Sequence, residues 1–214
     1  MDGKVMERRP VVTPPRGEVA PLPVRTEERT RGAYVWGVLR LFMGWTFLWT
    51  FLDKAFALGF STGRDPETGV IHFFQKGEAW FNGGSPTLGV LQYGLKGPFK
   101  GFYDSIAGVH MTANGPVASN HGWICVAYML SMLLIGLGLM AGIFARLAAI
   151  GGIIWLAIFY TATSIWPEHN PFLDDHLVYI AVLVGIVVVG AGRYLGLCKY
   201  WGRLDVVKRH PILA

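Results

Sequence analysis

The chain has 214 residues, of which 52% are hydrophobic and only 15% are charged. This balance excludes an ordinary water-soluble domain and is typical of a membrane protein. The net charge of +5 does not indicate nucleic-acid binding, because the basic residues are concentrated in the two tails of the chain.

Four long apolar stretches account for most of this hydrophobicity. They are Tyr34–Phe60, Trp123–Phe144, Leu147–Trp166 and Leu177–Leu197. About 20 apolar residues in a helix cross the roughly 30 Å hydrocarbon layer of a bilayer. The stretches are apolar on every face, whereas a soluble helix alternates polar and apolar faces. The sequence therefore predicts an all-α membrane protein, a bundle of four transmembrane helices within residues 32–200, with the lipid bilayer as its surroundings.

The charged residues outside these stretches predict the orientation of the bundle. The tails carry the basic residues Lys4, Arg8, Arg9, Arg16, Arg25, Arg29, Arg31, Lys199, Arg203, Lys208 and Arg209. Arg146 lies in the turn between the second and third stretches, and Glu168, Asp174 and Asp175 lie between the third and fourth. Basic loops stay on the cytoplasmic side. We therefore expect a multi-pass protein of the plasma membrane with both termini in the cytoplasm.

The two tails are expected to lie outside the membrane domain. Residues 1–31 hold five prolines among mixed charges and predict a disordered cytoplasmic tail, with the first span acting as an uncleaved signal anchor. Residues 201–214 form a short cytoplasmic C-terminal tail. The N-terminal tail is either an unstructured extension or a segment that docks a partner.

The outer loop, residues 61–121, is rich in aromatic residues for a solvated segment. Three of its pieces look helical and amphipathic: Ile71–Phe81, Thr87–Leu95 and Phe99–Val109. We expect a cap of short interfacial helices over the outer ends of the spans. Its aromatic residues would anchor the cap in the membrane, roof an amphipathic pocket open to the lipid, or do both.

Charged residues within the first span are the clearest anomaly of the chain, because ionisable groups are costly in a membrane. Arg40 lies well inside the predicted span, and it is either an anchor to lipid phosphate or a neighbouring helix, or part of a site. Asp53 and Lys54 lie near the outer boundary, where they either end the helix or contribute to a site.

A second polar group precedes the fourth stretch. Asn170 is expected to cap this helix and Pro171 to occupy its first position. Capping explains Asp174 only in part and does not explain His176. We expect these groups to face the same outer pocket as Asp53 and Lys54, where an acid and an imidazole suit proton-coupled chemistry on a quinone headgroup.

The remaining reactive residues favour no resident cofactor. Cys125 and Cys198 are predicted at opposite sides of the membrane, too far apart for a disulfide. The chain has no CxxC pair, flavin fingerprint or set of iron–sulfur cysteines, and its histidine spacing predicts neither metal nor haem. The small-residue pairs Gly138-x-x-x-Gly142 and Gly192-x-x-x-Gly196 predict close helix packing.

Several of these motifs together resemble the DoxX family, in particular its larger DoxX/DoxD type with a long outer loop. They are Arg40-x-x-x-Gly44-x-x-Phe47 running on to Asp53-Lys54, Lys96-Gly97-Pro98-Phe99, Asn170-Pro171-Phe172-Leu173-Asp174-Asp175-His176, and Gly190-Ala191-Gly192-Arg193-Tyr194-Leu195-Gly196-Leu197. The resemblance covers about Val35 to Leu197. It implies a four-span bundle that serves as a subunit of a thiosulfate:quinone oxidoreductase, or of a related membrane complex linked to thiol redox and oxidative stress.

The leading hypothesis is an integral membrane subunit of a quinone-linked redox complex. The residues expected to exchange protons are Asp53, Asp174 and His176, and those expected to hold the quinone or its anion are Arg40, Lys54 and Asp175. Electrons would come from another membrane or peripheral redox subunit. The main alternative is a non-catalytic scaffold of a respiratory assembly, and a small-solute carrier is a third.

Overall fold

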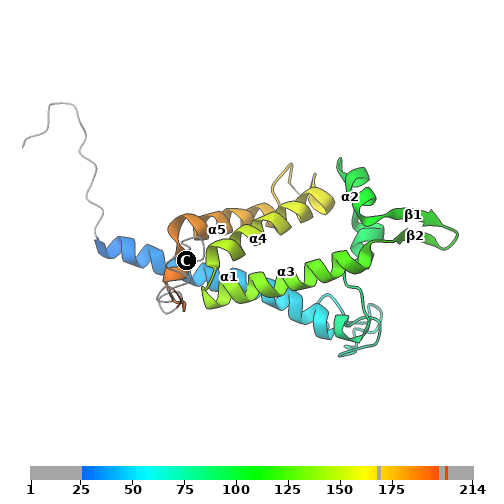
Figure 1. Ribbon diagram of the computed structural model, residues 1–214, viewed down its shortest axis with the longest axis horizontal. Coiled ribbons are helices and arrows are strands. Elements are labelled where there is room, and N and C mark those ends of the chain that lie inside the picture. Colours follow the sequence, from blue (N-terminus) through cyan, green and yellow to red (C-terminus); the bar gives the residue numbers. More distant parts are fainter. Residues whose placement is uncertain (1–25, 168–169, 198–200, 202–214) are drawn as a thin grey trace, which may run out of the picture.

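The computed structural model describes residues 26–167, 170–197 and 201, and within them the protein is mostly helical. Four long helices run along the molecule: α1 (Thr26–Phe56), α3 (His121–Ala141), α4 (Ala145–Phe159) and α5 (Asp175–Val189) (Figure 1). Because α1 begins at Thr26, the last residues of the predicted disordered tail are helical. Residues 1–25 and 202–214, the rest of the two predicted tails, lie outside the described residues.

Three helices in the described part of the chain are long and apolar enough to cross a membrane. They are Gly32–Phe56, His121–Ala141 and Ala145–Ser164, the last of which includes the π-helical turn η3 (Tyr160–Ser164). The fourth apolar helix, α5, has 15 residues. It rises about 22 Å, less than the roughly 30 Å hydrocarbon layer. The protein is therefore a helical membrane protein with three helices of spanning length and one shorter apolar helix.

The fourth helix differs from its prediction at both ends. Asp174 rather than Asn170 is its N-cap, because the Asp174 side chain accepts a hydrogen bond from the Leu177 amide at 3.2 Å. The Asn170 side chain instead accepts from the amides of Phe172 and Leu173, so it closes a separate turn. The predictions that Asn170 caps the helix and that Pro171 is its first residue are wrong.

At its other end α5 stops at Val189, eight residues before the predicted end at Leu197. Gly190 has a left-handed φ of 65°, and its amide donates back to the carbonyls of the last turn. This is a common way for helices to end. The chain then turns through η4 (Ala191–Arg193), and the Leu197 amide donates to the carbonyl of Ala141 at the end of α3.

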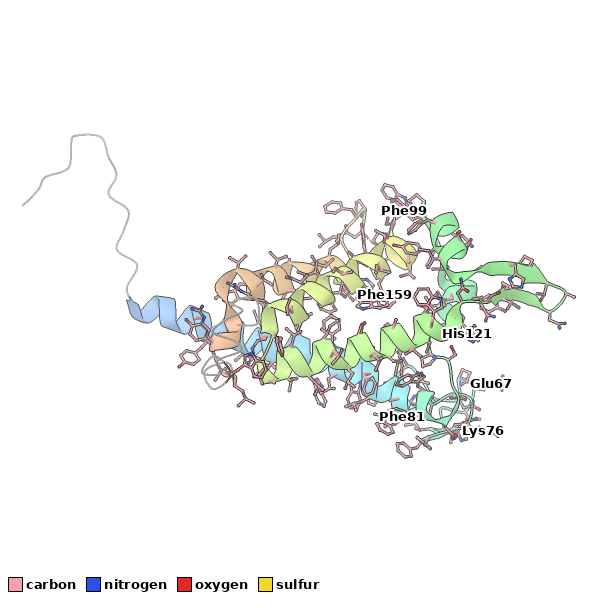
Figure 2. The ribbon with its side chains drawn as sticks, in the orientation of Figure 1. Glu67, Lys76, Phe81, Phe99, His121 and Phe159 are labelled. Carbon is pink, nitrogen blue, oxygen red and sulfur yellow. The ribbon has the colours of Figure 1, made fainter. Side chains whose placement is uncertain are left out.

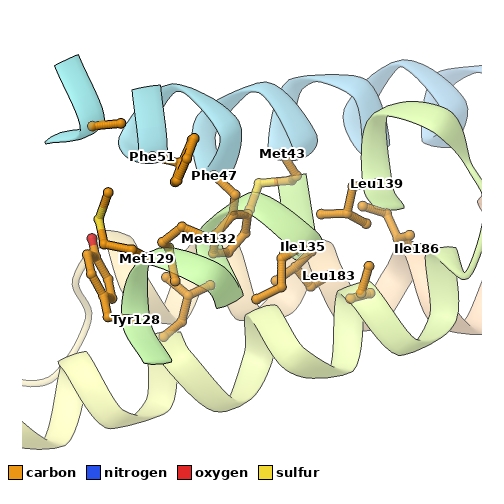
Figure 3. Close-up of a cluster of buried hydrophobic side chains, with 14 of the residues drawn as sticks. Met43, Phe47, Phe51, Tyr128, Met129, Met132, Ile135, Leu139, Leu183 and Ile186 are labelled. Atoms are coloured by element: carbon orange, nitrogen blue, oxygen red, sulfur yellow. The ribbon is translucent and has the colours of Figure 1, made fainter. Parts of the chain in front are cut away.

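The helices pack in pairs, α1 against α3 and α5 against α4, and α3 joins the two pairs by packing on α4 (Figure 1). Side chains from all four helices meet in one buried cluster, which includes Phe47 of α1, Met132 of α3, Leu156 of α4 and Leu183 of α5. Figure 3 shows part of this core. Lipid is as apolar as these side chains, so close packing rather than escape from water holds them together.

Glycines set the close approach of the first two spans. A Cβ atom on Gly44 would lie 2.8 Å from the backbone nitrogen of Met140, and one on Gly136 would lie 2.6 Å from that of Leu48. Both distances are shorter than a real Cβ atom allows, so a residue larger than glycine would push the two helices apart. The predicted pairs pack in the same way, since a Cβ on Gly192 would lie 3.0 Å from that of Ala145. The prediction of glycine-mediated packing is confirmed.

The outer loop folds differently from the predicted row of helices. Its helical pieces are η1 (Trp80–Asn82), η2 (Val90–Gly94) and α2 (Lys100–Ala107). The predicted pieces Thr87–Leu95 and Phe99–Val109 are mostly helical, whereas Ile71–Phe81 consists mainly of turns, with Gly77 at a positive φ. An antiparallel hairpin of β1 (Val109–Thr112) and β2 (Gly115–Ala118), which the helical interpretation missed, projects from the end of the bundle (Figure 1).

Candidate functional site

Arg40 is a completely buried charge at the end of the bundle where α3 stops. Its guanidinium donates to the carbonyls of Leu139 and Met140, the latter at 3.1 Å. It also donates to the carbonyls of Tyr194 and Leu195 at 3.2 and 2.9 Å. The last carbonyls of a helix have no partner within the helix and carry partial negative charge, so a cation is favourable there.

These contacts make Arg40 a link between three segments. It belongs to α1, it binds the last turn of α3, and it holds the stretch that follows η4. Of the alternatives predicted for Arg40, these contacts match an anchor to a neighbouring helix. Arg40 does not line the outer cavity described below.

Asp53 is the second buried charge, with 2% of its surface exposed. Its carboxylate accepts from the amide of Phe60 at 3.0 Å and from the amide and hydroxyl of Ser61 at 2.9 and 2.6 Å. The chain leaves α1 at Phe56 and turns back at once, and these bonds close that turn. In this geometry Asp53 organises the start of the outer loop.

Lys54 differs from its neighbour because its side chain lines a cavity. Its Nζ atom donates to the hydroxyl oxygen of Ser61 at 2.7 Å, and the side chain lines the cavity wall. The Ser61 hydroxyl therefore bridges the Asp53 carboxylate and the Lys54 ammonium. Sequence reasoning missed Ser61, and no local pattern marks it, because the loop brings it back to α1 only in the folded chain.

The cavity has a volume of about 310 Å³ and lies between the outer halves of α3 and α4, against the loop. Aromatic side chains form much of its wall: Trp123 and Tyr128 from α3, Trp155 and Phe159 from α4, and Tyr103 from α2. Figure 2 shows Phe159 on the side of α4 that faces α3. The cavity therefore has flat aromatic walls and the side chain of Lys54 in its lining.

Two hydroxyl groups near this wall differ in their bonding. The Tyr103 hydroxyl lies 2.6 Å from the Thr161 hydroxyl, so both are paired. The Thr87 hydroxyl, also in the lining, is buried and has no hydrogen-bond partner among the described residues. A buried polar atom without a partner is uncommon in native structures. Thr87 thus has an unused hydrogen-bonding group beside the cavity.

The acid–histidine pair at the start of α5 lies behind the cavity wall. His176 Nδ1 is 2.6 Å from the Asp174 carboxylate, and the His176 ring packs against Phe159 with centroids 6.1 Å apart. Asp175 is exposed in the first turn of α5. Of the site residues predicted from the sequence, Lys54 is the one found among the described residues that line the cavity. The structure therefore does not bring the predicted acids and His176 into one pocket with Lys54.

The described residues contain no group of three or more histidine, cysteine or acidic side chains placed to hold a metal ion. Cys125 is a buried free thiol in α3. Cys198 and His169 lie outside the described residues, so the predicted separation of the two cysteines stays a prediction.

Comparisons with known proteins place the chain in no group: no protein-family model, curated protein or solved structure matches it. The resemblance of its motifs to the DoxX family therefore stays a prediction from the sequence, and the function is argued from the geometry.

Proposed function

We propose that the protein is a DoxX-like, four-span subunit of a quinone-linked redox complex in the plasma membrane. Both termini would lie in the cytoplasm and the outer loop on the opposite side, with α5 as the fourth span. The course of the chain supports this arrangement. From Asp175 to Leu197 it runs from the loop end of the bundle to the end where α3 stops, where Leu197 binds Ala141.

The observation that carries the proposal is the position of Lys54 in an apolar, aromatic cavity. Ligand sites in proteins are typically cavities of about 300–1,000 Å³ with apolar walls and a few convergent polar groups. A quinone head is a flat ring with two carbonyl oxygens. The aromatic walls suit the ring, and the Lys54 ammonium and the unpartnered Thr87 hydroxyl suit the two oxygens.

The same groups would assist reduction of the quinone. Reduction to the quinol takes two electrons and two protons, and it places negative charge on the oxygens before they are protonated. A fixed ammonium stabilises such developing charge well in an apolar site. The exposed hydroxyl of Ser61, between Asp53 and Lys54, offers a route for protons from the outer side. The electrons would come from a partner redox protein.

The other predicted site residues take lesser parts in this proposal. Asp174 and His176 would exchange protons behind Phe159, supported by their 2.6 Å contact and by the packing of His176 on that ring. Arg40 would stabilise the bundle, and Asp175 would add negative charge at the outer surface.

Binding of a quinone analogue to the purified full-length protein tests the proposal. Lys54→Met should weaken binding by about 10- to 100-fold, the effect of losing one hydrogen bond to a charged group. Lys96→Met removes an exposed loop lysine and is the matched control, with unchanged affinity expected. Equal affinity of the Lys54 variant and the unchanged protein would refute the role of Lys54, and no binding at all would refute the quinone site.

The alternative function, a scaffold of a respiratory assembly, is favoured by one observation. Asp53 and Asp174 are both engaged in bonds that shape the backbone, as caps are. Purification from native membranes with its partners separates the two functions. A scaffold would still assemble and support full electron transfer with Lys54→Met, whereas a redox subunit would assemble normally and lose quinone reduction.

A further inference from the structure

A second apolar space runs between α3 and α4, nearer to the end where α3 stops. This groove has a volume of about 620 Å³. Its edges include Leu134 of α3 and Ile154 of α4, whose side chains are largely exposed. Small residues, Gly138 and Gly151, form part of its floor. The groove is therefore open along one side, where the surrounding lipid would lie.

The groove continues the Lys54 cavity along the same faces of the two helices. Trp155 lines both spaces. On α3 the lining residues are Ala127 in the cavity, then Ser131, Leu134, Gly138 and Ala141 in the groove. On α4 they are Ile158 in the cavity, Trp155 in both, then Gly151 and Ala148 in the groove. Residues three or four positions apart lie on one face of a helix. The two spaces thus lie one after the other along the same helix faces and meet at Trp155, whose ring contacts that of Tyr128 with centroids 5.5 Å apart.

The chemistry of the groove differs from that of the cavity. Ser131 carries the one hydroxyl among the described residues that line it, and that hydroxyl already donates to the Ala127 carbonyl at 2.6 Å. The other lining side chains are aliphatic or aromatic. The groove therefore lacks a spare hydroxyl like that of Thr87 in the cavity and suits a hydrocarbon chain.

We propose that the groove holds the polyisoprenoid tail of the quinone whose head occupies the Lys54 cavity. The inference rests on the proposed function and specifies its ligand as a long-tailed, membrane-resident quinone. From Ala127 to Ala141 helix α3 rises about 21 Å, at about 1.5 Å per residue. A tail of several isoprene units spans that distance, whereas a tail of one unit ends before Trp155 is passed. The tail leaves the cavity over the open side of Trp155 and lies along α3 and α4.

Photolabelling of the full-length protein in lipid nanodiscs tests this path. Two probes share one quinone head: the first carries a photoreactive group on the head, and the second carries it at the end of a long isoprenoid tail. We expect the head group to label the walls of the cavity, such as Trp123 or Thr87. We expect the tail end to label groove residues near Ala141 and Phe144, and an excess of unlabelled long-tailed quinone to suppress both.

A blocking variant adds a second readout. Leu134→Trp places a larger side chain at the groove and should reduce labelling by the tail-end probe several-fold, while labelling by a short-tailed head probe is unchanged. Leu130→Trp is the control, because Leu130 is an exposed leucine on the same helix that does not line the groove.

The outcomes separate the two levels of the proposal. If the head labels the cavity but the tail end labels scattered lipid-facing residues of α1 and α5, the tail path is wrong and the proposed function stands. The same conclusion follows if an ordinary phospholipid with a photoreactive acyl chain labels the groove equally well in the presence of excess quinone. If the head probe does not label the cavity, the proposed function fails and the tail path fails with it.

Discussion

Two basic residues of α1, one near the middle of the helix and one in its last turn, are used in opposite ways. Arg40 is completely enclosed, and its guanidinium donates to backbone carbonyls of α3 and of the segment after η4. Lys54 makes a hydrogen bond to Ser61 and otherwise faces a cavity. An ammonium carries three donor hydrogens. Lys54 therefore keeps donors for a ligand, whereas the guanidinium of Arg40 is directed at the protein itself.

This difference shows that burial of a charge does not by itself mark a functional site. Arg40 is the more deeply buried of the two, yet its surroundings are helix ends that need a cation. Lys54 is half-buried, and its surroundings are aromatic walls with space between them. The useful criterion is whether the protein already supplies the partners that the charge requires.

The largest effect is expected at Arg40. Arg40→Met should lower the free energy of unfolding by at least about 3 kcal/mol, because several buried carbonyls lose their donor at about 1–3 kcal/mol each. Thermal unfolding of the detergent-purified protein measures the change. Arg40→Lys should restore part of the stability, since an ammonium keeps the charge without the planar fork.

The matched control is Arg146→Met, at an exposed arginine in the first turn of α4. Its unfolding temperature should be nearly unchanged. If Arg40→Met were as stable as the unchanged protein but lost quinone binding, the division between a structural Arg40 and a functional Lys54 would be wrong.

Much of the fold could be predicted because spanning length is a property of local composition. The predicted stretches for the first three spans coincide with α1, α3 and α4 to within several residues. Arg40 could be recognised as a buried charge in the same way, because its position within an apolar stretch is visible in the sequence. Its partners could not, since they lie about 100 and 154 positions away in the chain.

The parts that could not be predicted depend on tertiary hydrogen bonds. Asn170 and Asp174 are both good N-cap residues, and only the folded chain shows that Asp174 binds the amide of Leu177. Likewise nothing in the sequence distinguishes Ser61 from the other three serines of the outer loop, and only the folded chain brings it to Asp53 and Lys54. These residues have equally suitable local sequences, and only contacts formed in the folded chain distinguish them. The local sequence therefore does not predict which residue makes the hydrogen bond.

The next largest effect is expected at Asp53, beside the functional lysine. Asp53→Asn replaces one carboxylate oxygen by an NH2 group that cannot accept a hydrogen bond, so the side chain can no longer accept from both Phe60 and Ser61 at once. We expect a loss of about 1–3 kcal/mol in unfolding free energy, measured by thermal unfolding. Quinone affinity should also fall, because Ser61 would no longer hold the Lys54 ammonium in place.

Asp104→Asn is the control for this substitution. Asp104 pairs with Lys100 at 2.6 Å on α2, and partly exposed pairs of this kind contribute about 0–1 kcal/mol. An Asp53 variant that lost stability while keeping full quinone affinity would limit Asp53 to a structural cap and would separate it from Lys54.

A smaller effect is expected at the start of α5. Asp174→Ala removes the N-cap and should cost about 1 kcal/mol, the usual loss for an N-cap. Asp175→Ala, one position further on, removes an exposed first-turn acid and should cost less, about 0.3–1 kcal/mol. Hydrogen exchange in the first turn of α5 measures both. If the two variants lost equal stability, the cap and the contact of Asp174 with His176 would add nothing to the stabilisation that any negative charge gives at the start of the helix.

The smallest effect is a pH dependence confined to the loop beyond Lys54. The amides of Thr68 and Glu67 donate to the ionised Asp65 carboxylate at 2.8 and 2.9 Å, and they hold its pKa below the usual value. This stabilisation is complete above the unfolded pKa of about 4 and is lost as the pH falls through the lowered pKa of the folded turn. As the pH falls through that lowered pKa, the protection of these two amides against exchange should decrease, while the protection of α1 does not. Asp65→Asn keeps an acceptor that does not titrate, so it should remove the pH dependence.

Acid-induced exchange that spread from this turn to the amides of Phe60 and Ser61 would give the opposite answer. It would show that the loop and the Lys54 end of α1 open together, and that the cavity depends on the loop as a whole.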